Sequence, residues 1–263
     1  MNINVAVTGA KGRMGSQVIS GILEHENMDL VACFDPCCVG EEVAQGLKIS
    51  SPDEMENLLK TVKPDVFVDF TNAASAVENV KIAARNNIKL VVGTTGFSEQ
   101  QYKEMADAIK VPAIISPNFS IGVNVFWKLI AAATGQLQAY GYHVEIIEMH
   151  HSHKKDAPSG TAVKAAGIIS DCLGVDKFVY GRHGITGERT DDEIGIHAVR
   201  AGDIVGEHTV LYAGRGERLE ITHRAHSREA FAQGAVKAIE WIDSKDESGI
   251  YSMDDMMQEL ELN

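Results

Sequence analysis

Short apolar runs alternate with helix-like segments through the first 118 residues, and this alternation constrains the fold more than any other feature. The runs are almost continuously apolar and rich in β-branched residues, as is typical of strands buried on both faces in a parallel sheet. Such a series of β-α-β units predicts an α/β fold with a Rossmann-type, doubly wound parallel sheet. The expected strands are 3–9, 29–35, 65–71, 89–96 and 112–118, and the expected helices are 14–26, 52–62, 73–87 and 98–110.

The pattern changes near residue 120, which predicts a second domain of a different kind. Later runs alternate apolar and polar residues, which favours an open, largely antiparallel sheet within a mixed α+β domain, with one solvated or partner-facing side. The expected strands are 143–150, 196–202, 207–214 and 217–225, and the expected helices are 124–140, 161–173 and 228–242.

Composition excludes several classes of protein. The formal net charge of −13 argues against a broad nucleic-acid-binding face. No stretch reaches the roughly 18 uncharged apolar residues of a membrane span, and the start MNINVAVTGA is unlike a signal peptide. The four cysteines lack the spacing of a zinc ribbon or a disulfide framework. We therefore expect a soluble, cytoplasmic protein with no nucleic-acid and no membrane partner.

A glycine-rich loop, VTGAKGRMG, joins the first expected strand to the first expected helix. Its glycines at 9, 12 and 15 permit a tight turn, and the amides at the helix start can face a diphosphate. Asp35 ends the second expected strand, where an acid hydrogen-bonds the adenosine ribose. The alternative is a turn that only links strand to helix, but strand, helix and acid together favour a dinucleotide site.

The preference between the two nicotinamide cofactors depends on a few residues near Asp35. Lys11 and Arg13 can add positive charge near a 2′-phosphate. Pro36 stands where an NADP-preferring site often carries an arginine, so we predict that NADH is preferred and NADPH tolerated. The loops GTTG (93–96) and SPNFS (116–120) follow the fourth and fifth expected strands, where ligands of open α/β sheets bind. These two loops are expected to line the nicotinamide site, although each alone could be an ordinary turn.

The segment HHSHKKDAPSGT (150–161) concentrates titratable and cationic groups in an acidic chain. A metal site is disfavoured, because His151 and His153 can share one face of a strand but His150 cannot join them, and the lysines repel a cation. A solvated charged loop explains the lysines but not three histidines beside a turn that opens a helix. Amides, the helix dipole and ammonium groups suit a carboxylate, and histidine can supply a proton near neutrality. The cluster predicts a site that binds a small polycarboxylate and protonates it.

Six motifs resemble the dihydrodipicolinate reductases, also called 4-hydroxy-tetrahydrodipicolinate reductases, of the diaminopimelate and lysine pathway. They are GAKGRMG, VGTTGFS, NFSIGVNV, EMHHSHKKDAPSGTA, VRAGDIVGEHTV and ERLEITHRAHSREAFAQGAVKAIEWI. The resemblance covers nearly the whole chain, and E-x-H-H-x-x-K-x-D-x-P-S-G-T is its most specific part.

The resemblance implies roles for individual residues. His150 would be the proton donor and Lys154 the catalytic lysine, while His151, Gly160 and Thr161 would contact the substrate, with no metal ion. The implied contacts with NADH or NADPH are Gly9, Ala10, Lys11, Gly12, Arg13, Met14, Asp35, Gly93, Thr94, Thr95, Ser116, Pro117, Asn118 and Phe119.

The implied reaction reduces 4-hydroxy-tetrahydrodipicolinate, by way of dihydrodipicolinate, to tetrahydrodipicolinate. Hydride reaches ring C4, His150 protonates the resulting enamine, and Lys154 assists. The implied organisation is a dinucleotide-binding domain (1–121), a substrate-binding and oligomerisation domain (122–227), and a C-terminal helix segment (228–263) that returns to the first domain. The family implies a homotetramer that binds a small dicarboxylate.

Two alternatives are kept beside this reading. One is another nicotinamide-dependent reductase acting on a different imine or aldehyde acid. The other is a non-catalytic dinucleotide sensor, which the presence of both His150 and Lys154 disfavours. His153, His223 and His226 have no required role.

Overall fold

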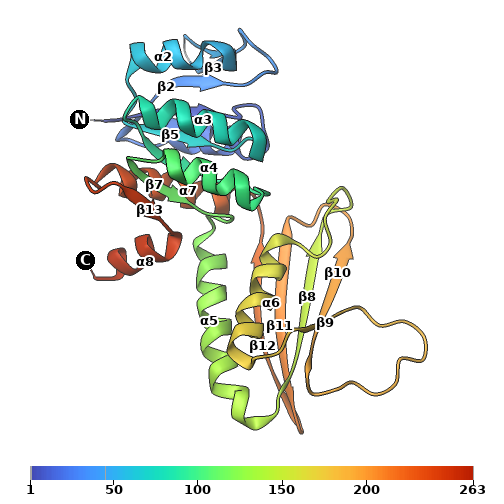
Figure 1. Cartoon of the computed structure of the whole chain (residues 1–263). Helices are drawn as coiled ribbons and strands as arrows, with labels where there is room; N and C mark the ends of the chain where they lie inside the picture. The colour runs from blue at the N-terminus through green and yellow to red at the C-terminus, as the bar shows by residue number, and fades with distance from the viewer. Residues whose placement is uncertain (1, 45, 263) are drawn as a thin grey trace. The chain divides into compact units, whose positions relative to one another are not determined.

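The computed structural model describes residues 2–44 and 46–262 (Figure 1). The chain divides into two compact units, one formed by Met1–Ser120 with Phe231–Asn263 and the other by Ile121–Ala230. The C-terminal segment therefore belongs to the same unit as the N-terminal half. The functions predicted for these segments remain predictions.

The first unit is built on one eight-stranded sheet with the order β13-β7-β6-β5-β1-β2-β4-β3. All neighbouring strands are parallel except β3 and β4. This arrangement confirms the predicted Rossmann-type sheet. Its strands are β1 (Ile3–Thr8), β2 (Met28–Phe34), β3 (Glu42–Ala44), β4 (Leu47–Ser50), β5 (Val66–Asp69), β6 (Lys89–Val92), β7 (Pro112–Ile115) and β13 (Gly249–Tyr251). Its helices are α1 (Gly15–Leu23), the 3-10 turn η1 (Pro52–Glu54), α2 (Met55–Val62), α3 (Ala73–Arg85), α4 (Glu99–Ala108), α7 (Glu229–Asp243) and α8 (Met253–Leu262).

The central strands of this sheet are buried along their length, which is why their sequences are continuously apolar. Val66, Phe67 and Val68 of β5 are fully buried, as are Val5 and Val7 of β1. Helices begin at polar caps that satisfy their first backbone N–H groups: the Asn72 side chain accepts from Ser75, and Ser98 forms a capping box with Gln101.

The strand order changes direction beside β1. The chain proceeds from β1 to β2 and β4 on one side, and then crosses to β5, β6 and β7 on the other. The carboxyl ends of β1 and β5 therefore flank the point at which open α/β sheets bind ligands. The glycine-rich loop follows β1, and Phe70 and Thr71 follow β5.

The second unit contains a five-stranded sheet with the order β12-β11-β8-β10-β9. Figure 1 shows helices α5 and α6 beside this sheet. Its strands are β8 (His143–His150), β9 (Lys177–Tyr180), β10 (Glu193–Arg200), β11 (Gly206–Gly214) and β12 (Glu217–Ala225), and its helices are α5 (Ile121–Leu137), η2 (Gln138–Tyr140) and α6 (Gly160–Leu173).

The sheet of the second unit is mixed, as expected, but it is not largely antiparallel. β10 is parallel to both β8 and β9, whereas β11 is antiparallel to β8 and β12. The connection from β8 through α6 to β9 accounts for parallel strands, because a crossover helix returns the chain to the same end of the sheet. Alternating residues indicate which face of a strand is buried, and they carry no information about the direction of its neighbour.

Five elements have no counterpart in the sequence prediction: β3, β4, β9, β13 and α8. The strands are only three or four residues long, too short for a period-2 pattern to stand out. Among the described residues, no helix is both long enough and apolar enough to cross a membrane.

Candidate active site

The glycine-rich loop packs against the backbone so closely that two of its glycines are required. Gly9 has φ +77°, and a Cβ atom there would lie 2.5 Å from the carbonyl oxygen of Phe70. A Cβ on Gly15, the first residue of α1, would lie 2.0 Å from the carbonyl oxygen of Gly9. The start of α1 is thereby held against the end of β1, where its first N–H groups can meet a phosphate.

Asp35 connects this loop to the segment after β2. Its Oδ2 accepts a hydrogen bond from the Lys11 N–H (2.9 Å) and its Oδ1 accepts one from the Cys37 N–H (2.9 Å). The carboxylate is only 7% exposed and borders a cleft of about 780 Å³. Residues from the loop and from the ends of β2 and β5 line this cleft, among them Gly9, Gly12, Asp35, Phe70, Thr71 and Asn72.

The nearby lysine of the loop is paired rather than free. Lys11 Nζ lies 2.7 Å from a carboxylate oxygen of Glu41, and the hydrogen bond to Glu41 raises the pKa of Lys11. Both side chains are solvent-exposed, so water and salt screen this pair. Part of the positive charge available for a 2′-phosphate beside Asp35 is therefore offset by Glu41.

The loops after β6 and β7 border a second cleft, of about 460 Å³, whose lining includes Thr94, Thr95, Ser116 and Pro117. Ser116 Oγ donates to the Asn118 carbonyl (2.8 Å), which shapes the loop that follows β7. Thr94, in the loop after β6, is buried, and its hydroxyl donates to Asp69 Oδ1 (2.6 Å). The side chain of Thr94 is thus used to fix the loop.

Asp69 and Phe70, at the end of β5, were missed by sequence reasoning. Burial raises the pKa of the Asp69 carboxyl, which is hydrogen-bonded by Thr71, Asn79 and Thr94. A Cβ on Gly93 would lie 2.0 Å from Phe70 Cε1, so Gly93 makes room for that ring. Asp69 could have been found in the sequence, because it is an acid at the end of an otherwise apolar strand, as Asp35 is.

In the second unit, His150 is the last residue of β8 and its side chain is on the buried face of the sheet. Its Nδ1 lies 2.6 Å from Glu148 Oε2, and the residue is 8% exposed. A Cβ on Gly206 would lie 3.0 Å from His150 Nε2. Glycine at 206 therefore leaves space beside the ring nitrogen that does not face Glu148.

Glu148 is fully buried and receives several donors. Arg200 donates from Nη1 to Oε2 (2.8 Å) and from Nη2 to Oε1 (2.7 Å), and the Ser159 N–H donates to Oε1 (3.0 Å). Burial alone would raise the pKa of Glu148, but the hydrogen bonds from His150 and Arg200 outweigh it and lower the pKa to about 2. The group is an anion throughout the physiological range.

Lys154 lies on the loop between β8 and α6. Its Nζ is 3.0 Å from Asp156 Oδ2, and the Asp156 carbonyl accepts from Arg200 Nη2 (2.6 Å). Arg200 therefore links this loop to Glu148.

The Pro-Ser-Gly-Thr turn opens α6 as the sequence predicts. Ser159 caps the helix by accepting from the Ala162 N–H (3.2 Å), and Gly160 is the first helical residue. Apart from its chain neighbours and the backbone of α6, no described atom lies within 4 Å of a Cβ built on Gly160, and the residue is exposed, so a ligand can approach it. N–H groups in a first helical turn have no acceptor within the helix and attract anions.

The other two histidines of the motif, His151 and His153, lie beyond the end of β8. His151 is half-buried and follows the strand, and its ring centroid is 6.3 Å from that of the exposed His153. In the part of the chain that the structure describes, no group of three or more His, Cys, Asp or Glu side chains could hold a metal ion.

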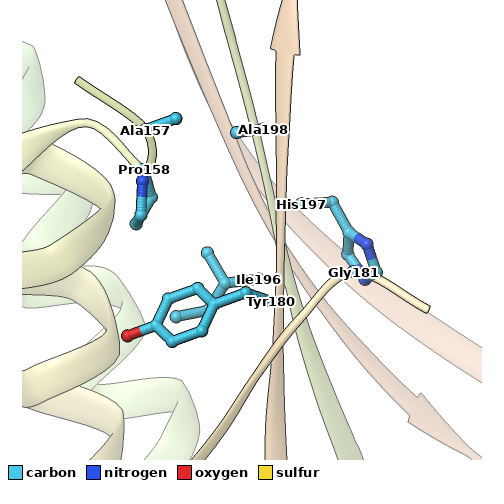
Figure 2. A pocket seen from close by; sticks show the side chains of 7 residues that line it. All are labelled: Ala157, Pro158, Tyr180, Gly181, Ile196, His197 and Ala198. Atoms are coloured by element: carbon cyan, nitrogen blue, oxygen red, sulfur yellow. The ribbon is translucent and has the colours of Figure 1, made fainter. Parts of the chain in front are cut away.

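A pocket of about 590 Å³ lies near the turn in the same unit (Figure 2). Its lining residues are Ala157, Pro158, Tyr180, Gly181, Ile196, His197 and Ala198. No lysine or arginine is among them, and His197 hydrogen-bonds Glu145 (2.7 Å). These walls do not suit a dicarboxylate, whereas the amides of the turn and Lys154 do.

Comparisons with known proteins identify the family of the chain. The family model for the dihydrodipicolinate reductase N-terminus matches residues 3–119, and the model for the C-terminus of the same enzyme matches residues 122–257. The chain belongs to the dihydrodipicolinate reductase family.

Curated relatives within the dihydrodipicolinate reductase family are similar over nearly their full length. The 4-hydroxy-tetrahydrodipicolinate reductase of Methanocaldococcus jannaschii is 52% identical over 269 residues, covering 97% of each chain. That of Methanothermobacter thermautotrophicus is 48% identical over 271 residues, covering 97% of this chain and 98% of the relative. Both carry the name that the motifs of this chain suggest.

Among solved structures, the dipicolinate-bound dihydrodipicolinate reductase of Paenisporosarcina sp. TG-14 superposes with a TM-score of 0.76 at 30% identity, covering 96% of this chain and 98% of that one. An amine dehydrogenase from Mycobacterium smegmatis (TM-score 0.60, 14% identity, 97% and 96% coverage) shares the fold alone.

Each unit of the chain contains one set of predicted residues. The first unit contains the loops predicted to bind cofactor, and the second contains His150, His151, Lys154, Gly160 and Thr161. Sequence reasoning missed Glu148, Arg200 and Gly206, although all three lie in motifs that carry the family resemblance.

Proposed function

We propose that this chain is the NAD(P)H-dependent reductase that converts 4-hydroxy-tetrahydrodipicolinate to tetrahydrodipicolinate in diaminopimelate and lysine biosynthesis. The observation that carries the proposal is the buried His150 with one ring nitrogen held by Glu148, in a unit that also presents Lys154 and the open first turn of α6. Full-length relatives at about 50% identity bear this enzyme's name.

The residues of the first unit fit a nicotinamide dinucleotide. The close approach at Gly9 and Gly15 would be filled by any Cβ, so the loop is shaped for a backbone-bound phosphate. Asp35 retains acceptor capacity for the ribose hydroxyls, and the loops at 93–95 and 116–119 would bind the nicotinamide half. When bound, the cofactor supplies the hydride.

The substrate carries two carboxylates, and the second unit offers groups that bind them. We propose that Gly160 and Thr161 hold one carboxylate through the backbone N–H groups at the start of α6 and through the Thr161 hydroxyl, while Lys154 and His151 contact the ring and the second carboxylate. The dipicolinate in the related structure from Paenisporosarcina is a flat dicarboxylate of the same size, which supports this class of ligand.

The proton is proposed to come from His150. Because Nδ1 faces Glu148, the available donor is Nε2, and Gly206 leaves that nitrogen uncovered. Protonation of an enamine at carbon is slow without a positioned acid, and Lys154 stabilises the negative charge that develops on the substrate.

The direct test is to follow NADH absorbance with freshly made product of the preceding synthase as substrate. We expect rapid oxidation that requires this substrate. Turnover with a different imine or aldehyde acid and none with this one would favour the alternative reductase, and binding of NADH without any turnover would favour a sensor.

Inhibition by flat dicarboxylates tests the anion site. Pyridine with carboxylates at both carbons flanking nitrogen should compete with substrate, and more weakly as salt rises. Removing one carboxylate deletes charged hydrogen bonds worth about 1.5–3 kcal/mol each, so affinity should fall at least about tenfold. Thr161→Val should weaken the dicarboxylate and spare a monocarboxylate that lacks that contact. Equal inhibition by mono- and dicarboxylates would contradict the assignment.

Cofactor preference tests Asp35 and its neighbours. Asp35→Ala should weaken NADH more than NADPH, because the carboxylate accepts from ribose hydroxyls and repels a 2′-phosphate. Glu41→Gln releases Lys11 and should strengthen NADPH by a few-fold with little change for NADH. Titration calorimetry with both cofactors measures these changes, and equal losses for both in Asp35→Ala would remove Asp35 from the site.

The oligomer and location are also proposals. Ile147 and Met149 of β8 and Leu211 of β11 are half-buried and alternate with fully buried neighbours, so they lie on the open face of the second sheet. These apolar side chains on the open face support a homotetramer, which sedimentation equilibrium would test, and the composition favours a cytoplasmic enzyme.

A further inference from the structure

We infer that Glu148 is the positioning residue for the proton donor: its carboxylate holds His150 by Nδ1 and so makes Nε2 the nitrogen that gives the proton. This inference rests on the proposed function. It assigns a role to the buried acid of the E-x-H-H motif, two residues before the histidine.

Strand geometry places the two groups together. Side chains two residues apart on a strand lie on the same face, and Glu148 and His150 both face the interior of the second unit. Glu148 is 0% exposed and the Nδ1···Oε2 separation is 2.6 Å, slightly shorter than the usual length of about 2.7–2.9 Å for a charge-assisted N–H···O hydrogen bond. A buried carboxylate that orients an imidazole fixes which ring nitrogen is left to react.

The acceptor positions of Glu148 are shared among parts of the site with different functions. Oε2 accepts from Arg200 and is paired with His150, whereas Oε1 accepts from Arg200 and from the Ser159 N–H. Through Arg200 the carboxylate also reaches the Asp156 carbonyl, on the loop of Lys154. One anion thus holds the acid, the lysine loop and the turn that opens α6.

The charges around His150 make this anion necessary. The charged or titratable groups nearby are Arg200 on β10, Lys154 and Asp156 on the loop before α6, His208 on β11, and beyond it His223 on β12. Burial, and then the charge of His150, lower the pKa of His208 to about 3, so His208 is neutral at working pH. Arg200 and Lys154 oppose a proton on His150, and Glu148 is the carboxylate that contacts the ring.

The test is the pH dependence of kcat at saturating substrate. Glu148→Gln keeps the size of the side chain and removes its charge, so the pH above which kcat falls should move down by about one unit or more. The loss of turnover should therefore grow with pH, reaching about tenfold for each unit of the shift once the pH is above both limbs. Glu148→Asp keeps the charge, so it should retain the wild-type position of this limb even where kcat is lower. A merely structural role predicts equal loss at every pH.

Arg200→Gln should shift the pH above which kcat falls in the opposite direction. It removes a cation from the same carboxylate, so the limb should move to higher pH, whatever the change in kcat from loosening the Lys154 loop. Glu145→Gln is the matched control: this acid is on the same strand, facing the opposite way, and also pairs with an arginine and a histidine. In Glu145→Gln the pH above which kcat falls should be the same as in the wild type.

The outcomes separate this inference from the proposed function. A wild-type enzyme that does not reduce the substrate overturns the function itself. A wild-type enzyme that does so, with an unmoved limb in Glu148→Gln or with Arg200→Gln shifted downward, overturns the role of Glu148. Circular dichroism shows whether Glu148→Gln folds. If it does not, the pH limbs of Arg200→Gln and of the double variant Glu148→Gln/Arg200→Gln test the inference instead, because the double variant leaves neither charge of this pair buried without its partner.

Discussion

Replacing the proposed proton donor should abolish most of the activity: we expect His150→Gln to lower kcat by about 10² to 10⁴, the range that general acid–base catalysis contributes. Glutamine can still hydrogen-bond Glu148 but cannot donate a proton to carbon near neutral pH. NADH affinity should be nearly unchanged, because the residues proposed to bind the cofactor belong to the other unit of the chain.

Steady-state kinetics and NADH titration of the same preparation measure the two effects. His153→Gln is the matched control, since His153 lies three residues further along the motif and is exposed, and it should retain wild-type kcat. A fall in kcat of less than tenfold in His150→Gln would show that the proton comes from another group.

The second large effect is expected at the glycine-rich loop. In Gly15→Ala the new methyl group would lie 2.0 Å from the Gly9 carbonyl oxygen, a backbone atom that cannot turn aside. The start of α1 must then move away from β1, and overpacking of this kind costs about 1–3 kcal/mol. Because the same backbone is proposed to bind the diphosphate, NADH affinity should fall by about tenfold to a hundredfold.

Calorimetric titration with NADH measures this loss, and thermal unfolding measures the accompanying destabilisation. Gly21→Ala, on the same helix, is the control, because its methyl group would meet only the side chain of Val236, at 3.0 Å. That variant should bind NADH normally. Full NADH affinity in Gly15→Ala would exclude the loop as the diphosphate site.

The sequence prediction was accurate where the signal came from residues that are close together in the chain. The five central strands of the first unit, β1, β2, β5, β6 and β7, were predicted correctly because residues such as Val66 to Val68 are buried on both faces and must be apolar. The start of α6 was predicted within one residue because Ser-Gly-Thr after proline is a local capping signal. The prediction of a largely antiparallel second sheet was wrong at β10, which is parallel to both of its neighbours. Strand direction depends on the path of the chain between strands.

The sequence by itself determined the Rossmann-type sheet, the glycine-rich loop and the histidine-lysine motif, because each depends on neighbours within a few residues along the chain. Only the tertiary structure decided that Glu148 contacts His150 and Arg200, that Gly206 leaves Nε2 open, and that Phe70 packs at Gly93. Arg200 is 52 residues from Glu148 in the sequence, and it is the parallel register of β10 beside β8 that brings the two together. Such contacts arise from the pairing of distant strands, for which the local pattern of apolar and polar residues carries no signal.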